Sequence, residues 1–117
     1  MGDDADLDAL NVAIAEEMVA CGRQDLLPVG IDEDGSEYTR VPNFARSLDA
    51  LRDGPERVLR DAGCFFSLAL RIGSDSEIYG IGWLKNGGPH YGVYDGATEA
   101  EARARAVLAA LRARKEA

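Results

Sequence analysis

The C-terminal part of the chain contains a pattern that allows few arrangements. Residues 94–96 (Tyr-Asp-Gly) close an aromatic segment on a glycine turn. Thr98 and Glu101 then have the spacing of a capping box, in which each side chain satisfies the other's backbone N–H. Small and apolar residues recur at three- and four-residue steps at Ala100, Ala104, Val107, Leu108 and Leu111. This spacing predicts a helix that packs one face against a sheet, with Leu108 central to the contact.

Two further helical regions are expected nearer the N-terminus. Residues 4–20 begin with several acidic residues, which suit the positive end of a helix dipole, and Gly22 suits the left-handed position after a helix. Asn43 is expected to cap a second helix. Gly54 and Pro55 should interrupt that helix, because glycine ends a helix readily and proline fits the first turn of the next one.

The period of the apolar residues changes to two between residues 64 and 95. Turn residues at 73–76 and 86–89 divide this region into three extended segments, which predict an antiparallel meander. The segment 65–72 is apolar in both registers, so helices are expected on both faces of the sheet. The predicted fold class is α+β: an α-β-α sandwich in one domain over residues 1–117. Its expected order is helix, short hairpin, helix, three-stranded meander, helix.

An acidic turn at residues 32–36 (Asp-Glu-Asp-Gly-Ser) separates two short extended pieces at residues 29–31 and 37–41. Turn residues between extended pieces predict a hairpin. A calcium-binding loop would need an acid where Gly30 stands and a glutamate where Val41 stands. A solvated turn is therefore the interpretation, and no metal site is expected.

Composition restricts the partners of the chain. A formal net charge of −8 opposes binding to extended nucleic acid, although a local cluster of cations still permits a small anionic ligand. No apolar run approaches the roughly 20 residues of a membrane helix, and the acidic start is unlike a secretory signal. No membrane contact and a cytoplasmic location are therefore expected. Cys21 and Cys64 are too few for a disulfide framework and are interpreted as small buried residues.

Signatures of catalysis are absent from the sequence. The chain has one histidine and lacks a nucleophile elbow, a phosphate-binding loop and a paired-histidine metal motif. Gly80 and Gly82 lack the strand-to-helix context of a dinucleotide site, and they are interpreted as places where a helix approaches a strand closely. The chain is therefore predicted not to be an enzyme, with no catalytic residue and no cofactor.

Aromatic and cationic residues gather in the second hairpin of the meander. Aromatic rings beside a cation suit a nucleobase, another ring ligand or a partner protein. The candidate ligand-binding residues are Tyr79, Lys85, His90, Tyr91 and Tyr94. The expected partner is a small anionic or aromatic ligand or a host protein. The alternative is that the aromatic residues of this hairpin, Trp83 among them, are core residues beneath a helix.

Four segments carry a resemblance to a known family. Residues 7–17 form an amphipathic start, residues 41–44 (Val-Pro-Asn-Phe) open a helix, and residues 47–51 (Ser-Leu-Asp-Ala-Leu) continue it. After the meander, residues 97–111 supply an alanine-rich closing helix. Over almost its whole length the chain resembles the phage ABA sandwich family, small phage and prophage proteins in which helices flank a short antiparallel sheet. The resemblance implies a bacteriophage protein in the bacterial host cytosol and transfers no catalytic residue.

Two functions from different classes follow as hypotheses. The first is a non-enzymatic phage-type binding protein that sequesters a host factor or a small ligand, such as a nucleotide immune signal, in anti-defence. The alternative is a protein–protein interaction module of a phage or prophage accessory protein, which uses a helix face or a sheet edge. A homo-oligomer is expected, because the sheet edges need protection and a chain of this size offers little concave surface.

Overall fold

The computed structural model describes the backbone of residues 4–72, 77–85, 90–96 and 98–116, and the side chains of residues 5–64 and 98–113. The elements in chain order are α1 (Asp4–Ala20), the 3-10 turn η1 (Gln24–Leu26), β1 (Val29–Ile31), β2 (Glu37–Thr39), the 3-10 turn η2 (Phe44–Arg46), α2 (Leu48–Asp53), α3 (Pro55–Asp61), β3 (Cys64–Ile72), β4 (Glu77–Lys85), β5 (His90–Gly96) and α4 (Glu99–Glu116). The α+β class predicted from the sequence is confirmed.

Local sequence signals set most helix boundaries. The first helix has the predicted bounds, and Gly22 follows it with a φ of 78°, a left-handed conformation that glycine adopts without steric cost. Pro55 begins α3 directly after the glycine that ends α2. The cap predicted at Asn43 is wrong: Ser47 caps α2, and its Oγ accepts a hydrogen bond from the Ala50 N–H at 3.2 Å.

Asn43 instead takes part in a polar contact between η2 and α1. The buried Asn11 donates from Nδ2 to Asn43 Oδ1 at 3.0 Å, and its own Oδ1 accepts from the Ala45 N–H at 2.8 Å. Arg46 donates to the same Asn43 oxygen at 2.9 Å and pairs with Asp8 at 3.2 Å. The Asn43 side chain therefore fastens η2 to α1, a role that requires a partner 32 residues away and leaves no local signal.

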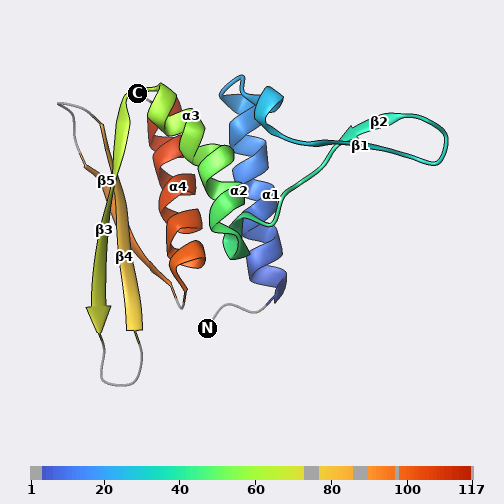
Figure 1. Ribbon diagram of the computed structural model, residues 1–117. Coiled ribbons are helices and arrows are strands. Elements are labelled where there is room, and N and C mark those ends of the chain that lie inside the picture. Colours follow the sequence, from blue (N-terminus) through green and yellow to red (C-terminus); the bar gives the residue numbers. More distant parts are fainter. Residues whose placement is uncertain (1–3, 73–76, 86–89, 97, 117) are drawn as a thin grey trace.

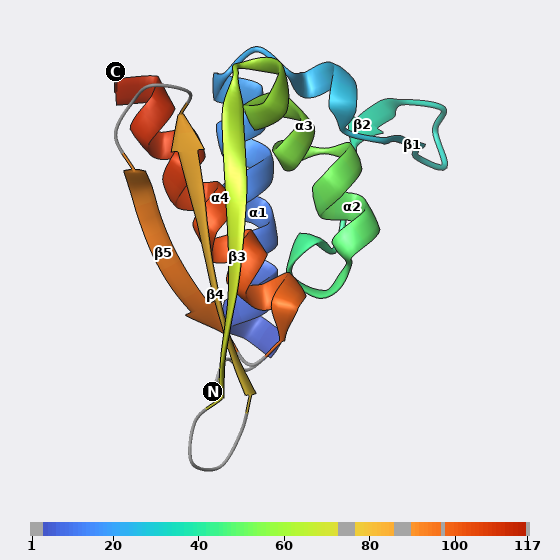
Figure 2. The ribbon, with the colours of Figure 1, turned by 60° about the vertical axis from the view of Figure 1, so that its left-hand side comes forward.

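The layers are ordered differently from the predicted sandwich. Figure 1 shows the sheet of β3, β4 and β5 on one side of the molecule, α4 against it, and the other helices beyond α4. Figure 2 shows the same order from a second direction. α4 contacts β4 and β5 on one side and α1 on another, while α3 also contacts β3. The helices therefore lie on one side of the sheet, and the predicted placement of helices on both faces is wrong; a helix, not the sheet, is the middle layer.

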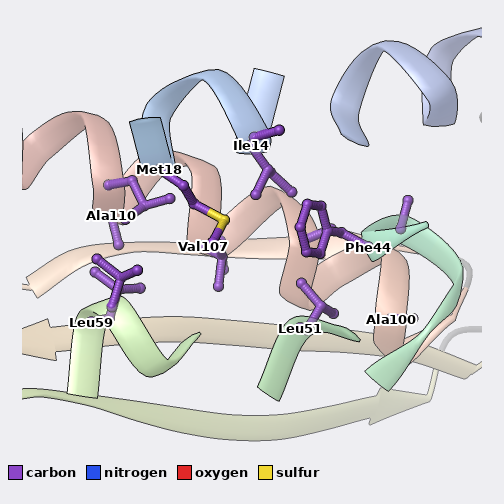
Figure 3. Close-up of a cluster of buried hydrophobic side chains, with 14 of the residues drawn as sticks. Ile14, Met18, Phe44, Leu51, Leu59, Ala100, Val107 and Ala110 are labelled. Atoms are coloured by element: carbon purple, nitrogen blue, oxygen red, sulfur yellow. The ribbon is translucent and has the colours of Figure 1, made fainter. Parts of the chain in front are cut away.

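The alanine content of α4 agrees with this middle position. Four alanines on different sides of the helix are at most 2% exposed: Ala102, Ala104, Ala106 and Ala110. A helix covered on all sides carries small or apolar residues all round, and alanine lets its neighbours approach closely. Figure 3 shows side chains of α1, η2, α2 and α3 gathered around Val107 and Ala110 of α4. Val107 and Leu111 are fully buried, whereas Leu108 is only partly buried.

The strands β3, β4 and β5 pair antiparallel in that order, with β4 in the middle. β3 and β4 keep one register from Cys64–Lys85 to Ile72–Glu77. The pairing of β4 with β5 shifts between Gly82 and Leu84, where β5 has one more residue than β4. Such a bulge bends the strand and changes which residues share a face. Separately, β1 and β2 form their own two-stranded sheet.

Candidate functional site

The predicted ligand-binding residues are spread along β4 and β5. In the backbone register, Tyr79 lies opposite Gly96, and Tyr94 lies opposite Ile81, so these two tyrosines share one end of the sheet. Lys85 lies at the other end of β4, opposite Cys64. At about 3.4 Å per residue, the six steps from Tyr79 to Lys85 separate their Cα atoms by roughly 20 Å.

The register also assigns these residues to faces of the sheet. Alternation along β4 puts Tyr79 and Lys85 on one face, and Tyr94 joins them through its pairing. His90 lies opposite Leu84, which belongs to the other face, and Tyr91 falls within the bulge. The side chains of all five residues lie outside the described part of the structure, so their ligand-binding role stays a prediction; the backbone brings Tyr79 and Tyr94 together and separates both from Lys85 and His90.

The hairpin β1–β2 is the most exposed part of the described chain. Figure 1 shows it extending from the helical layer on the side away from the sheet. All residues from 31 to 41 are exposed. We call residues 29–41 the arm. The arm is held by its own pairing, Val29–Thr39, Gly30–Tyr38 and Ile31–Glu37, and not by burial against the body.

One face of the arm, which we call its apolar face, carries two exposed aliphatic side chains. Val29 and Ile31 share this face with Thr39 and Glu37, and they are 60% and 71% exposed. On the other face the Tyr38 ring lies over Gly30, where a Cβ atom would come within 2.4 Å of the ring. The tyrosine therefore covers the backbone of one face and leaves two branched aliphatic side chains open on the other.

The tip of the arm is a defined acidic turn, as the sequence predicts. The Gly35 N–H donates to the Asp32 carbonyl at 3.0 Å, and the Asp32 N–H donates to the Ser36 carbonyl at 2.8 Å. The Ser36 N–H donates to Asp34 Oδ1 at 3.0 Å, and this bond lowers the pKa of the Asp34 carboxyl below its ordinary value. The turn therefore favours the charged form of the exposed Asp34 carboxylate. Among the described residues, His, Cys, Asp and Glu side chains nowhere group in threes as a metal site would require.

Polar contacts anchor the base of the arm. Gln24 of η1 donates to Thr39 Oγ1 at 2.9 Å. Arg23 pairs with Asp25 at 3.2 Å and with Asp61 of α3 at 3.0 Å, and these hydrogen bonds raise the pKa of Arg23 and lower that of Asp25. The arm therefore leaves the body at a fixed place beside the end of α3.

A cavity lies where α4 begins beside η2 and α1. It has a volume of about 470 Å³, and Leu7, Ala45, Leu48 and Ala100 contribute an apolar lining. Arg46 also lines it, but this guanidinium is engaged by Asp8 and Asn43. The lining therefore favours an apolar group.

A buried ion pair joins α3 to α4. Glu56 is fully buried, and its two carboxylate oxygens accept from Nε and Nη2 of Arg103, the former at 2.7 Å. Arg103 also donates to Glu99 at 3.0 Å. Burial opposes the charge of Arg103, but its hydrogen bonds to both glutamates outweigh burial and raise its pKa. Because the carboxylate is fully enclosed, the pair positions helices and offers no surface to a substrate.

No family model, curated protein or solved structure matches the chain. Within the described residues, none of the helices is both long and apolar enough to cross a membrane.

The sequence predicted the hairpin and its acidic turn but not the exposure of the arm. The shortness of its strands was a signal. Each strand has three residues, so β1 can offer at most two side chains to a core on one face and one on the other, which is too few to bury the hairpin. The cavity left no signal, because its lining comes from three segments far apart in the chain.

Proposed function

We propose that this chain is a protein–protein interaction module that presents its arm to a partner protein. The observation that carries the proposal is the apolar face of the arm, where Val29 and Ile31 are more than half exposed on a hairpin standing clear of the helical body. A single exposed aliphatic residue is ordinary on a protein surface. Two together on a two-stranded hairpin are a different case, because such a hairpin is marginally stable in water without packing.

Burial energetics support this proposal. Full burial of an exposed aliphatic side chain of this size contributes about 1.5–3 kcal/mol. Burial of both residues against a partner would therefore contribute favourably to the free energy of binding. The anchored base reduces the entropy lost on docking, because it fixes the place where the arm leaves the body.

A matched pair of double variants tests the proposal. Val29→Ser with Ile31→Ser removes the apolar face of the arm, and Val12→Ser with Val19→Ser removes two exposed valines of α1. Both variants should fold, since all four residues are exposed. In quantitative pull-downs from the source cells, the amount of a co-purifying protein should be at least tenfold lower with the arm variant than with the α1 variant. Equal retention by both variants would contradict the proposal.

The phage resemblance supports a more specific version. In this version the module is a bacteriophage protein of the host cytosol, and its partner is a host factor engaged in anti-defence. The small-ligand alternative, sequestration of a nucleotide immune signal, would use Tyr79, Lys85, His90, Tyr91 and Tyr94. Of the two, the interaction module has more support, because it rests on the exposed aliphatic side chains of the arm, whereas the ligand site rests on the residue types of β4 and β5 alone.

Self-association is proposed for the sheet. The sequence of β3 is apolar in both registers, while the helices lie on one side of the sheet. A second copy packed on the other side would cover that face. The homo-oligomer expected from the sequence differs in its contact, since it protects a sheet edge. Sedimentation of the purified chain tests this proposal: a dimer at micromolar concentration is expected, and a monomer at all accessible concentrations would contradict it.

A further inference from the structure

The outer edge of β1 has the form of a strand-pairing site. The Arg40 N–H donates to the Pro28 carbonyl and the Asp32 N–H donates to the Ser36 carbonyl, both at 2.8 Å. In an antiparallel pair the inward backbone groups belong to alternate residues. The N–H and C=O groups of Val29 and Ile31 therefore point away from β2, along the outer edge.

The charge around this edge has one sign. The arm carries four carboxylates, Asp32, Glu33, Asp34 and Glu37, against one arginine, a net charge of −3. Glu37 lies opposite Ile31 on the apolar face, and the remaining carboxylates form the tip. The edge that carries the two aliphatic side chains therefore has carboxylates beside it from Ile31 to the tip.

We propose that this edge takes an extended, basic segment of another protein as a third strand. The inference rests on the proposed function and names its partner class. Backbone hydrogen bonds to Val29 and Ile31 supply affinity, alternate aliphatic side chains of the added strand cover the apolar face, and its lysines or arginines lie beside the carboxylates. A second copy of this arm fits poorly at this edge, because it is equally acidic. Nucleic acid fits poorly for the same reason.

Three labelled peptides test the inference by fluorescence anisotropy with the full chain. The first is a nine-residue peptide alternating valine and lysine, the second alternates valine and glutamate, and the third repeats the first with N-methyl groups on alternate residues. The lysine peptide should bind at least tenfold tighter than either of the others. Binding should weaken as salt is raised, since exposed charges are screened. Equal affinity for the N-methylated peptide would overturn strand pairing, and equal affinity for the glutamate peptide would overturn the basic partner class.

Charge variants separate a local effect from the general acidity of the protein. Asp32→Asn, Glu33→Gln and Asp34→Asn together remove three charges from the tip, and Asn keeps the oxygen that the Ser36 N–H uses. The control removes three charges from the helices: Glu16→Gln, Asp49→Asn and Asp53→Asn. The affinity for the lysine peptide should fall at least fivefold in the tip variant and less than twofold in the control. Equal weakening would show nonspecific attraction and overturn the inference.

The outcome also distinguishes this inference from the proposed function. If no peptide binds but the arm variant still loses a captured protein, the partner is not a basic strand and the interaction module stands. If sedimentation shows a dimer that Val29→Ser with Ile31→Ser dissolves, the occupant is a second copy and the basic-partner inference is wrong. If the peptides bind as expected but the arm variant loses no cellular partner, the edge pairs strands and the proposed function fails.

Discussion

The helical body and the arm of this protein are stabilised in different ways. In the body, α4 is enclosed by the sheet and the other helices, and its neighbours bury large side chains such as Phe44 and Leu59. In the arm, residues 31–41 are exposed, and the order comes from cross-strand pairing and a tight turn. The body therefore determines the fold, whereas the residues of the arm are available for a partner with little consequence for the fold.

The largest effect is expected where the body encloses charge. Arg103→Met leaves the fully buried Glu56 without its guanidinium and should destabilise the protein by about 3–5 kcal/mol, the cost of an uncompensated buried charge. Arg52→Met is the control, because Arg52 pairs with exposed carboxylates and should cost about 0–1 kcal/mol. Urea unfolding of both variants measures the difference, and similar losses would show that the Glu56 pair is not enclosed.

The next effect concerns packing on α4. Leu111 is fully buried, so Leu111→Ala should cost about 2–5 kcal/mol through lost burial and a residual cavity. Leu108→Ala should cost less, since Leu108 is only partly buried. Thermal and denaturant unfolding check the ranking. A larger loss from Leu108→Ala would mean that α4 is rotated relative to the described packing.

A smaller effect is expected at the start of α4. The Glu101 N–H donates to Thr98 Oγ1 at 3.1 Å, half of the capping box predicted from the sequence. Thr98→Ala should therefore cost about 1 kcal/mol, while Thr98→Ser should be nearly neutral because serine supplies the same oxygen. Equal losses from the two substitutions in urea titrations would show that the hydroxyl does not act as a cap.

The smallest effect lies in the tip of the arm. The Ser36 N–H holds the pKa of Asp34 below its ordinary value of about 3.9, so this contact is present above that pH and is lost as the pH falls through the lowered pKa. The Ser36 amide resonance should move with a midpoint below 3.9, and amides of α4 should not follow it. A midpoint at or above 3.9 would contradict the hydrogen bond.

Local features of the fold were predictable from the sequence. The bounds of α1, the break at Gly54 and Pro55, the turn at residues 32–36 and the cap at Thr98 all depend on residues within one or two turns. Each of these signals acts through the backbone conformation of its own segment.

Features that depend on distant residues were not predictable in the same way. Glu56 looks like an exposed helix residue until Arg103 is placed beside it from 47 positions away. The sequence pattern of α4 indicates one packing face, which includes Ala104. The burial of Ala102, Ala106 and Ala110 as well, and with it the order of the layers, left no periodic signal. In the candidate site, simple alternation along β5 would put His90 and Tyr94 on one face of the sheet. The register shift at Gly82 and Leu84 puts them on opposite faces.

Amide hydrogen exchange in the full chain, with and without the valine–lysine peptide, tests the central claim most directly. In the free chain the amides of Val29 and Ile31, which point away from β2, should exchange near the rate of an unstructured chain. The amide of the buried Val107 should be strongly protected. Saturating peptide should slow exchange at Val29 and Ile31 at least tenfold and leave Val107 unchanged. Protection of Val29 and Ile31 in the free chain, or no change at saturating peptide, would contradict an arm that stands outside the body and is completed by a partner strand.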